Sequence, residues 1–153
     1  MQRKHDITFV ASILTFKTKK MATKIFVNLP VKNLQKSMDF FSQLGYTFNA
    51  QFTDDKAACM VISEDIYTML LLEPFFKTFT AKEISDAHKS TEVLIALSTD
   101  SRDNVDAMVN KAVAAGATET QQPQDHGFMY SRSFNDLDGH IWEILWMDES
   151  AVE

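Results

Sequence analysis

The side chain with the clearest capacity for chemistry in this sequence is Glu143, a carboxylate inside an apolar segment near the C-terminus. Residues 141–147 read Ile-Trp-Glu-Ile-Leu-Trp-Met, a pattern typical of a β-strand in which Ile141 and Leu145 share the face of Glu143. A buried charge there costs several kcal/mol unless a cation, hydrogen bonds or solvent satisfies it. We therefore expect this face to line a cavity, where Glu143 would ligate a cation or transfer a proton. A solvated edge strand is the alternative.

Three further side chains are candidates for the same site. His126 lies in a loop before the segment 129–134, and its imidazole suits acid–base chemistry, although a solvated loop histidine is the simpler interpretation. Tyr130 and Arg132 share one face of that segment. Arg132 would then pair with Glu143 or hold an anionic ligand, with an ordinary surface arginine as the alternative.

Other reactive residue types give weaker signals. Cys59 lies in an apolar segment with no nearby base or cation, which favours a buried core residue over a reactive thiol. His140 follows a glycine in a turn and is expected to pack rather than to bind a ligand. The sequence has no Gly-rich phosphate loop, Ser-centred nucleophile elbow or paired-cysteine metal spacing.

Length and composition indicate one ordinary globular domain without a nucleic-acid or membrane partner. The chain has 153 residues and a net charge of -6, with no block rich in lysine and arginine inside the expected fold. No apolar run approaches the roughly 18 residues of a membrane span. Cys59 is the only cysteine, so no intrachain disulfide can form, and we expect a cytoplasmic protein.

Residues 1–20 are expected to form an extension outside the fold. An apolar stretch at 7–16 follows basic residues, like the first two regions of a signal peptide, but a basic stretch comes next and no small-residue cleavage site is present. Met21 reads like a second start. We expect residues 21–150 to form a single domain, with a cleaved signal as the alternative for the extension.

From Lys24 onward, the first half of the sequence has the order strand, helix and three strands. The helix expected after Asn33 carries apolar residues at helical spacing and ends at Gly45, where a left-handed residue is wanted. The four strands expected in this half are residues 25–29, 46–52, 57–62 and 66–72.

The second half repeats this order, which indicates an internal duplication. A helix is expected after Asp100 or Ser101, and it ends at Gly116. The expected strands are residues 92–97, 118–121, 129–134 and 140–147. We therefore predict an α+β fold of two β-α-β-β-β modules, residues 24–72 and 91–148, with a ligand cleft between their sheets.

The linker between the modules, residues 73–90, is expected to contain a short helix. Thr80 and Glu83 have the spacing of a capping box. An aromatic cluster of Phe75, Phe76 and Phe79 precedes it. Simple packing of the linker on the sheet is one interpretation of the cluster, and a lid or partner surface is the other.

Two motifs carry a resemblance to a known family. They are residues 29–37, Leu-Pro-Val-Lys-Asn-Leu-Gln-Lys-Ser, and the Asp-Gly-His turn at 138–140 before Trp142 and Glu143. Together with the duplicated module, they resemble the vicinal oxygen chelate superfamily of glyoxalases, bleomycin resistance proteins and extradiol dioxygenases. The resemblance covers residues 24–148, looks closest to bacterial predicted lactoylglutathione lyases, and implies mixed, curved sheets around a cleft.

The resemblance also implies where a metal would lie. In metal-dependent members, a residue on each module's first strand and a carboxylate on each last strand hold the metal, or a subset of these does. The last-strand carboxylate corresponds to Glu143, whereas the first-strand positions correspond to Phe26 and Leu94, which cannot donate an electron pair. A register shifted by two would instead bring up Asn28 and Glu92 as oxygen ligands. We expect the ligand cleft to be lined by Phe26, Asn28, Glu92, Leu94, Tyr130, Arg132 and Glu143.

The resemblance implies small-molecule binding in the cleft of a homodimer, and the missing ligand positions favour a protein without a cofactor. The alternative is an enzyme, a metal-dependent glyoxalase-type lyase or related dioxygenase, in which nickel, zinc, manganese or iron polarises the substrate oxygens and Glu143 is a ligand. A dimeric regulatory or structural protein that has lost its ligand is a third interpretation.

Overall fold

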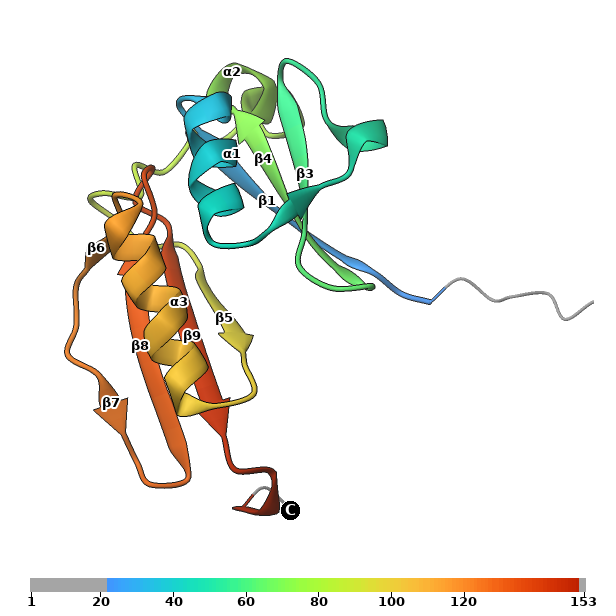
Figure 1. Ribbon diagram of the computed structural model, residues 1–153. Helices are drawn as coiled ribbons and strands as arrows, with labels where there is room; N and C mark the ends of the chain where they lie inside the picture. The colour runs from blue at the N-terminus through green and yellow to red at the C-terminus, as the bar shows by residue number, and fades with distance from the viewer. Residues whose placement is uncertain (1–21, 152–153) are drawn as a thin grey trace, which may run out of the picture.

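The computed structural model describes residues 22–151, which form two modules joined by a connecting segment (Figure 1). The extension expected at residues 1–20 lies outside the described residues. Within the described range, every helix is too short or too polar to span a bilayer.

The first module places one helix against a four-stranded sheet. Its elements are β1 (Ile25–Val31), α1 (Leu34–Gln43), β2 (Thr47–Phe48), β3 (Ala57–Val61) and β4 (Ile66–Leu72). The sheet has the order β1-β4-β3-β2, in which β1 runs parallel to β4 and the other pairs are antiparallel. The first and last strands of the module are therefore neighbours.

The second module repeats this arrangement. Its elements are β5 (Leu94–Ser98), α3 (Arg102–Ala114), β6 (Thr118–Glu119), β7 (Gln124–Asp125), β8 (Met129–Asn135) and β9 (Ile141–Met147), followed by a 3-10 turn at Glu149–Ala151. The order is β5-β9-β8-β6, with β7 paired to β8 and β5 parallel to β9. The repeated order and pairing confirm the predicted α+β fold of β-α-β-β-β modules.

Local sequence sets the ends of both helices. The side chains of Asn33 and Ser101 each accept a hydrogen bond from the backbone N–H three residues later, at 3.0 and 3.2 Å. Gly45 and Gly116 follow the helices with φ of 100° and 112°, a left-handed conformation that glycine adopts readily. These contacts confirm the predicted starts and stops.

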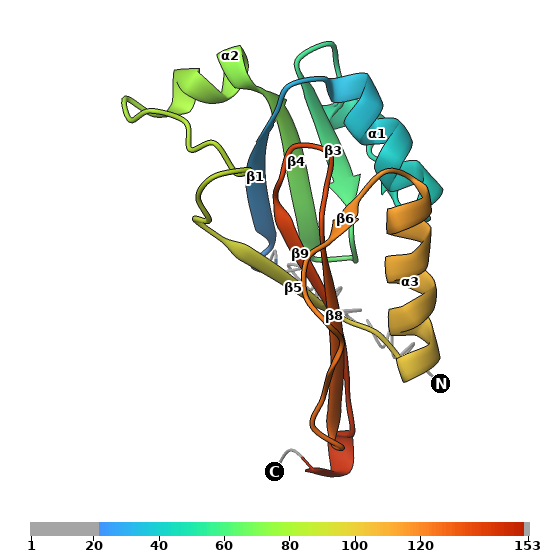
Figure 2. The ribbon, with the colours of Figure 1, turned by 90° about the vertical axis from the view of Figure 1, so that its left-hand side faces the viewer.

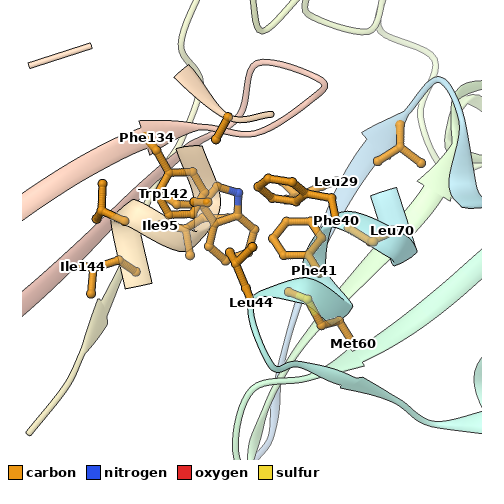
Figure 3. Close-up of a cluster of buried hydrophobic side chains, with 14 of the residues drawn as sticks. Leu29, Phe40, Phe41, Leu44, Met60, Leu70, Ile95, Phe134, Trp142 and Ile144 are labelled. Atoms are coloured by element: carbon orange, nitrogen blue, oxygen red, sulfur yellow. The ribbon is translucent and has the colours of Figure 1, made fainter. Parts of the chain in front are cut away.

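The modules share one hydrophobic core, which lies where α1 and α3 meet the sheets behind them (Figure 3). The ring centroids of Phe41 and Trp142 lie 5.1 Å apart, and those of Phe40 and Phe134 lie 6.2 Å apart, both edge to face. Each of these four side chains is at most 2% exposed. Figure 2 shows α1 and α3 on the same side of the molecule. On the opposite side the only α-helix in the described structure is the four-residue α2 (Glu73–Phe76), which contacts β1 and β4.

Most predicted strand bounds differ from those observed, and at three strands the difference changes the local structure. The strand expected at 46–52 shortens to β2 and continues as a 3-10 helix, Ala50–Phe52, because Asn49 accepts a hydrogen bond from the backbone N–H of Gln51 at 2.9 Å. The strand expected at 92–97 begins at β5, which leaves Glu92 ahead of the sheet. The strand expected at 118–121 ends early, and the chain rejoins the sheet as β7.

The connecting segment forms its helical turns earlier than predicted. It contains α2 (Glu73–Phe76) and a 3-10 turn, Lys77–Phe79, whereas the helix expected from Thr80 is absent from the described structure. Pro74 is accommodated in the first turn of α2, where its missing N–H leaves no bond unmade. The Thr80 hydroxyl accepts from the backbone N–H of Lys82 at 3.1 Å, a local bond that competes with helix formation.

Candidate ligand site between the modules

A pocket of about 350 Å³ lies between the two modules. It is bounded by β1, by residues 80–93 of the connecting segment and by the start of β9. The apolar lining residues are Val27, Leu29, Pro30, Phe76, Ile84, Ala87, Val93 and Ile141. The polar lining residues include Asn28, Lys82, Glu83, Ser90, Thr91 and Glu92. The pocket therefore combines an apolar interior with a few hydrogen-bonding groups, as small-molecule sites do.

Asn28 and Glu92 both line this pocket, one through strand alternation and the other through its position ahead of β5. On β1, the side chains of Leu29 and Val31 are buried in the core at 2% and 1% exposure, so alternation sends Asn28 to the other face. Glu92 lies two residues ahead of β5, in the segment that forms a wall of the pocket. The structure thus brings together two of the residues predicted for the cleft.

Phe26 and Leu94 lie outside this pocket. They are 49% and 60% exposed, and the ring of Phe26 stacks on Tyr67 with centroids 4.9 Å apart. Both residues belong to the first strand of their module, on the side of the molecule opposite α1 and α3. Their apolar side chains are therefore available for contact with something outside residues 22–151 of this chain.

Glu143 points to the open face of the second sheet, since Trp142 and Ile144 on either side of it are buried. It is half-buried and lies opposite Ser133 on β8 and Ala96 on β5. It lines a separate hollow of about 50 Å³ with Gln121, Gln122, Gln124, Ser131, Arg132 and Ser133. None of the ion pairs within residues 22–151 involves its carboxylate. Glu143 and the pair Asn28 and Glu92 therefore line different hollows.

Arg132 does not pair with Glu143, so of the alternatives predicted for it, this one is wrong. Its guanidinium bonds Asp106 on α3 at 2.8 Å and, through Nε and Nη2, both carboxylate oxygens of Glu119 at 2.9 Å. Tyr130, two residues earlier on the same strand, bonds the same carboxylate, because its hydroxyl donates to Asp106 at 2.9 Å. Because Ser133 is the residue opposite Glu143, alternation turns Tyr130 and Arg132 toward α3, and neither lines the pocket between the modules.

The charges around Arg132 form a structural cluster. Hydrogen bonds from Arg132 lower the pKa of Asp106 and of Glu119, against the opposing effect of desolvation. The bonds to Glu119, followed by those to Asp106, raise the pKa of Arg132. The cluster therefore stays charged and fastens β8 to α3 and β6.

His126 lies away from both hollows. It is exposed in the turn between β7 and β8, and its backbone N–H donates to the carbonyl of Met129 at 2.9 Å. The neighbouring carboxylate of Asp125 accepts two hydrogen bonds from Arg102, at 2.6 and 2.9 Å, which with a backbone bond lower the pKa of Asp125 to about 2. The structure thus gives this loop an ion pair and leaves the imidazole of His126 without a place in the candidate site.

The turn before β9 contributes more to the pocket than the sequence suggested. His140 is 8% exposed and lines the pocket, with Nε2 2.7 Å from the carbonyl oxygen of Pro30. Asp136 is also buried. Its carboxylate accepts bonds from the Trp142 indole and from the backbone N–H groups of Asp138 and His140, all at 3.0 Å. Burial nevertheless raises the pKa of Asp136. In the sequence, the Asp-Gly-His motif was the feature that could have indicated this role. It marks a turn that contacts both modules.

Among residues 22–151, the donor set for a metal is incomplete. Within residues 22–151, no three His, Cys, Asp or Glu side chains converge to hold a metal ion. Phe26 and Leu94 cannot supply the missing donors. Cys59 is 1% exposed, as predicted for a core residue, and burial raises the pKa of its thiol. The described residues therefore do not fit a preformed tight divalent site.

Comparisons with known proteins agree with this architecture. The protein SA1046 from S. aureus, a hypothetical protein, is similar with a TM-score of 0.71 and 28% sequence identity, over 83% of this chain and 95% of that chain. A glyoxalase/bleomycin resistance protein/dioxygenase family enzyme from Burkholderia phytofirmans PsJN gives 0.72 and 17%, over 83% and 100%. The bleomycin resistance determinant encoded on transposon Tn5 gives 0.58 and 15%, over 83% and 99%.

The sequence itself carries the family signature. No curated protein sequence matches the chain. The family model of the Glyoxalase/Bleomycin resistance protein/Dioxygenase superfamily matches residues 25–144, which span both modules. The chain therefore belongs to the glyoxalase/bleomycin resistance protein/dioxygenase superfamily, as the sequence motifs predicted.

Proposed function

We propose that this protein binds a small organic molecule in the pocket between its modules, without a tightly held metal ion. The observation that carries the proposal is the pocket itself. Its volume of about 350 Å³ falls within the range of roughly 300–1,000 Å³ that is usual for ligand sites. Superfamily membership supports it, since one similar structure is that of a bleomycin resistance determinant.

The lining favours a ligand with an apolar part and a polar end. Val27, Ile84 and Val93 offer apolar surface, which gains free energy when it is removed from water. Asn28 offers an amide that can both donate and accept hydrogen bonds. Lys82 and Glu92 are exposed residues of the lining, so a charged group of the ligand would meet them at the pocket opening.

The pocket can be blocked at a single residue. Val93 lines the pocket and is 42% exposed, so Val93→Trp would place an indole there without disturbing the core. Val113 on α3 is 43% exposed and lies outside the pocket, which makes Val113→Trp a matched control. With 8-anilinonaphthalene-1-sulfonate as the probe, we expect Val93→Trp to weaken binding roughly tenfold or more and the control to bind like the wild type. Equal binding by both variants would refute this pocket as the site.

A metal-dependent glyoxalase-type lyase is the second candidate, and Glu143 is the observation that favours it. Its carboxylate faces the open side of the sheet and has no ion-pair partner in residues 22–151, so it is available as a ligand for nickel, zinc, manganese or iron. Metal analysis after purification without added metal, and again after dialysis against nickel or zinc, separates the candidates. Stoichiometric tight metal would replace the first proposal by the second.

A homodimer is part of the same proposal. Within the described residues, β1 and β5 each pair with a single strand, so each presents a free edge. Ile25, Phe26 and Leu94 are 53%, 49% and 60% exposed on these strands, and Phe79 is 68% exposed on the connecting segment. A two-fold dimer could cover the free strand edges and the exposed apolar side chains in the same interface.

A further inference from the structure

Residues 80–93, which we call the strap, form one wall of the pocket but are tied loosely to the rest of the chain. Figure 2 shows this irregular segment running beside β1 on its way from α2 to β5. In the described structure, the backbone hydrogen bonds of residues 81–91 are local, with Lys89 and Ser90 each donating to the carbonyl of Asp86 at 2.9 Å. Segments with few such ties open at low free-energy cost.

One side chain from outside the strap holds its first part. The ammonium of Lys77 donates to the carbonyl of Lys82 at 2.6 Å and pairs with Glu83 at 3.2 Å. Glu83 is almost fully exposed, so the ion pair adds little, and the hydrogen bond to the Lys82 carbonyl is what holds this part of the strap. The second part of the strap, which carries Ile84 and Ala87 toward the pocket, needs a different attachment.

This second part packs closely against the backbone of Gly139 in the turn before β9. A Cβ atom added at Gly139 would lie 2.8 Å from the backbone nitrogen of His88 and 2.9 Å from the carbonyl carbon of Ala87. Real Cβ atoms do not approach backbone atoms so closely, so only glycine lets the turn and the strap meet. The contact is thus specific to this residue type.

The turn that carries Gly139 is itself firmly anchored in the first module. Asp138 accepts bonds from the backbone N–H of Lys32 at 2.8 Å and from the Ser37 hydroxyl at 3.0 Å. His140, on the other side of the glycine, bonds the carbonyl of Pro30 at 2.7 Å. The strap, which has few bonds of its own, therefore packs against a turn that is bonded to both modules.

We propose that the strap is a gate over the pocket and that its contact with Gly139 is the latch that keeps the gate closed. Ile84 and Ala87 are half-buried and line the pocket, so lifting the strap removes part of the wall and admits a ligand. What enters the pocket rests on the proposed function, whereas the latch can be tested without any ligand.

Gly139→Ala tests the latch, and Gly45→Ala is its control. Both glycines have positive φ, 92° and 100°, so alanine is strained at both, but an added Cβ at Gly45 meets no atom within 4 Å. In hydrogen exchange without ligand, we expect the strap amides to exchange about tenfold faster in Gly139→Ala, and at the wild-type rate in Gly45→Ala. We also expect 8-anilinonaphthalene-1-sulfonate to enter and leave Gly139→Ala faster in stopped-flow measurements.

The outcomes separate the latch from the pocket. Unchanged strap exchange in Gly139→Ala, or an increase spread evenly over both modules, would overturn the latch. Failure of the probe to bind the wild type would instead count against the proposed function. If Gly139→Ala does not fold, Lys77→Met loosens the strap from its other end, and strap exchange that stays at the wild-type rate in this variant contradicts the gate.

Discussion

At the level of single residues, the neighbours of Glu143 can donate hydrogen bonds to it but most of them carry no charge. They are the amides of three glutamines and the hydroxyls of Ser131 and Ser133. The cation in the same hollow, Arg132, is committed to Asp106 and Glu119 on the other side of the sheet. Glu143 is therefore available to a donor or a cation supplied from outside the described chain.

Replacing Glu143 by glutamine tests whether this availability is used. We expect Glu143→Gln to change the free energy of unfolding by less than about 0.5 kcal/mol, because no ion pair within residues 22–151 is lost. Probe binding in the pocket between the modules should also be unchanged, since Glu143 does not line it. Urea unfolding and fluorescence titration measure both. A large loss of stability or of probe binding would show that Glu143 acts on the fold or on that pocket.

The ion pair of Arg102 and Asp125 predicts a specific pH dependence. The pKa of Asp125 falls from 3.8 to about 2 on folding, so the unfolded chain binds its proton more readily. The stabilisation is present above pH 4 and is lost as the pH falls toward 2. Arg102→Gln removes the share that comes from the ion pair and keeps the bond from the Gly127 backbone N–H, so the stability difference from the wild type should shrink over that range. A residual difference should persist, since Arg102 also lies over the rings of Tyr130 and Trp146, at 5.3 and 5.1 Å. Urea unfolding at several pH values measures it, and a constant difference would contradict the assignment.

At the level of elements, α1 joins the two modules through aromatic contacts with β8 and β9 of the second sheet. Phe41 on α1 lies edge to face against Phe40, Tyr46 and Trp142. Because Trp142 belongs to β9, a side chain of the first module completes the core of the second. The two modules should therefore unfold as one unit.

Truncating this contact should destabilise both modules together. We expect Phe41→Ala to lower the free energy of unfolding by about 3–5 kcal/mol, with a single transition retained. Phe52→Ala is the control, because Phe52 is 62% exposed and its loss should cost less than about 0.5 kcal/mol. Chemical denaturation followed by both tryptophan fluorescence and circular dichroism measures the effect. Two separate transitions in the wild type would contradict a shared core.

The elements also show which features the sequence could reveal. Asn33, Gly45 and Gly116 were predicted correctly as helix ends, and Ser101 as one of two candidates, because their bonds and backbone angles are local. The partner of Arg132 was not, since it depends on the β8–β9 register and on where α3 packs. The pocket was predicted only in part: Asn28 and Glu92 reach it, but the roles of the strap and the Asp-Gly-His turn arise from contacts between distant segments.

At the level of the whole molecule, the sheet faces opposite α1 and α3 and the free edges of β1 and β5 set how the chain meets other molecules. Exposed strand edges with apolar side chains promote association unless they are charged or covered. The edge of β5 presents Leu94 at 60% exposure. The proposed homodimer would bury this residue.

A charge at Leu94 should therefore weaken the dimer. We expect Leu94→Lys to raise the dimer dissociation constant by roughly tenfold or more, because a lysine would lose hydration on burial. Val113→Lys is the control on the helix side, where Val113 is 43% exposed. Sedimentation velocity at micromolar concentration measures both. A wild type that stays monomeric there would refute the dimer, and a dimer unaffected by Leu94→Lys would place its interface elsewhere.

The parallel pairing of first and last strands also has a consequence for how this chain folds as it is synthesised. Ile25 is paired with Ile66, and Leu94 with Ile141, so each sheet closes over a loop that includes nearly its whole module. Loop-closure entropy must be overcome before such contacts stabilise anything, which slows folding. The first strand of each module therefore emerges from the ribosome long before its partner strand. Until that partner is made, its apolar side chains stay exposed to water. The first module, once closed, still lacks Trp142 against Phe41 until the last strand of the chain has been made.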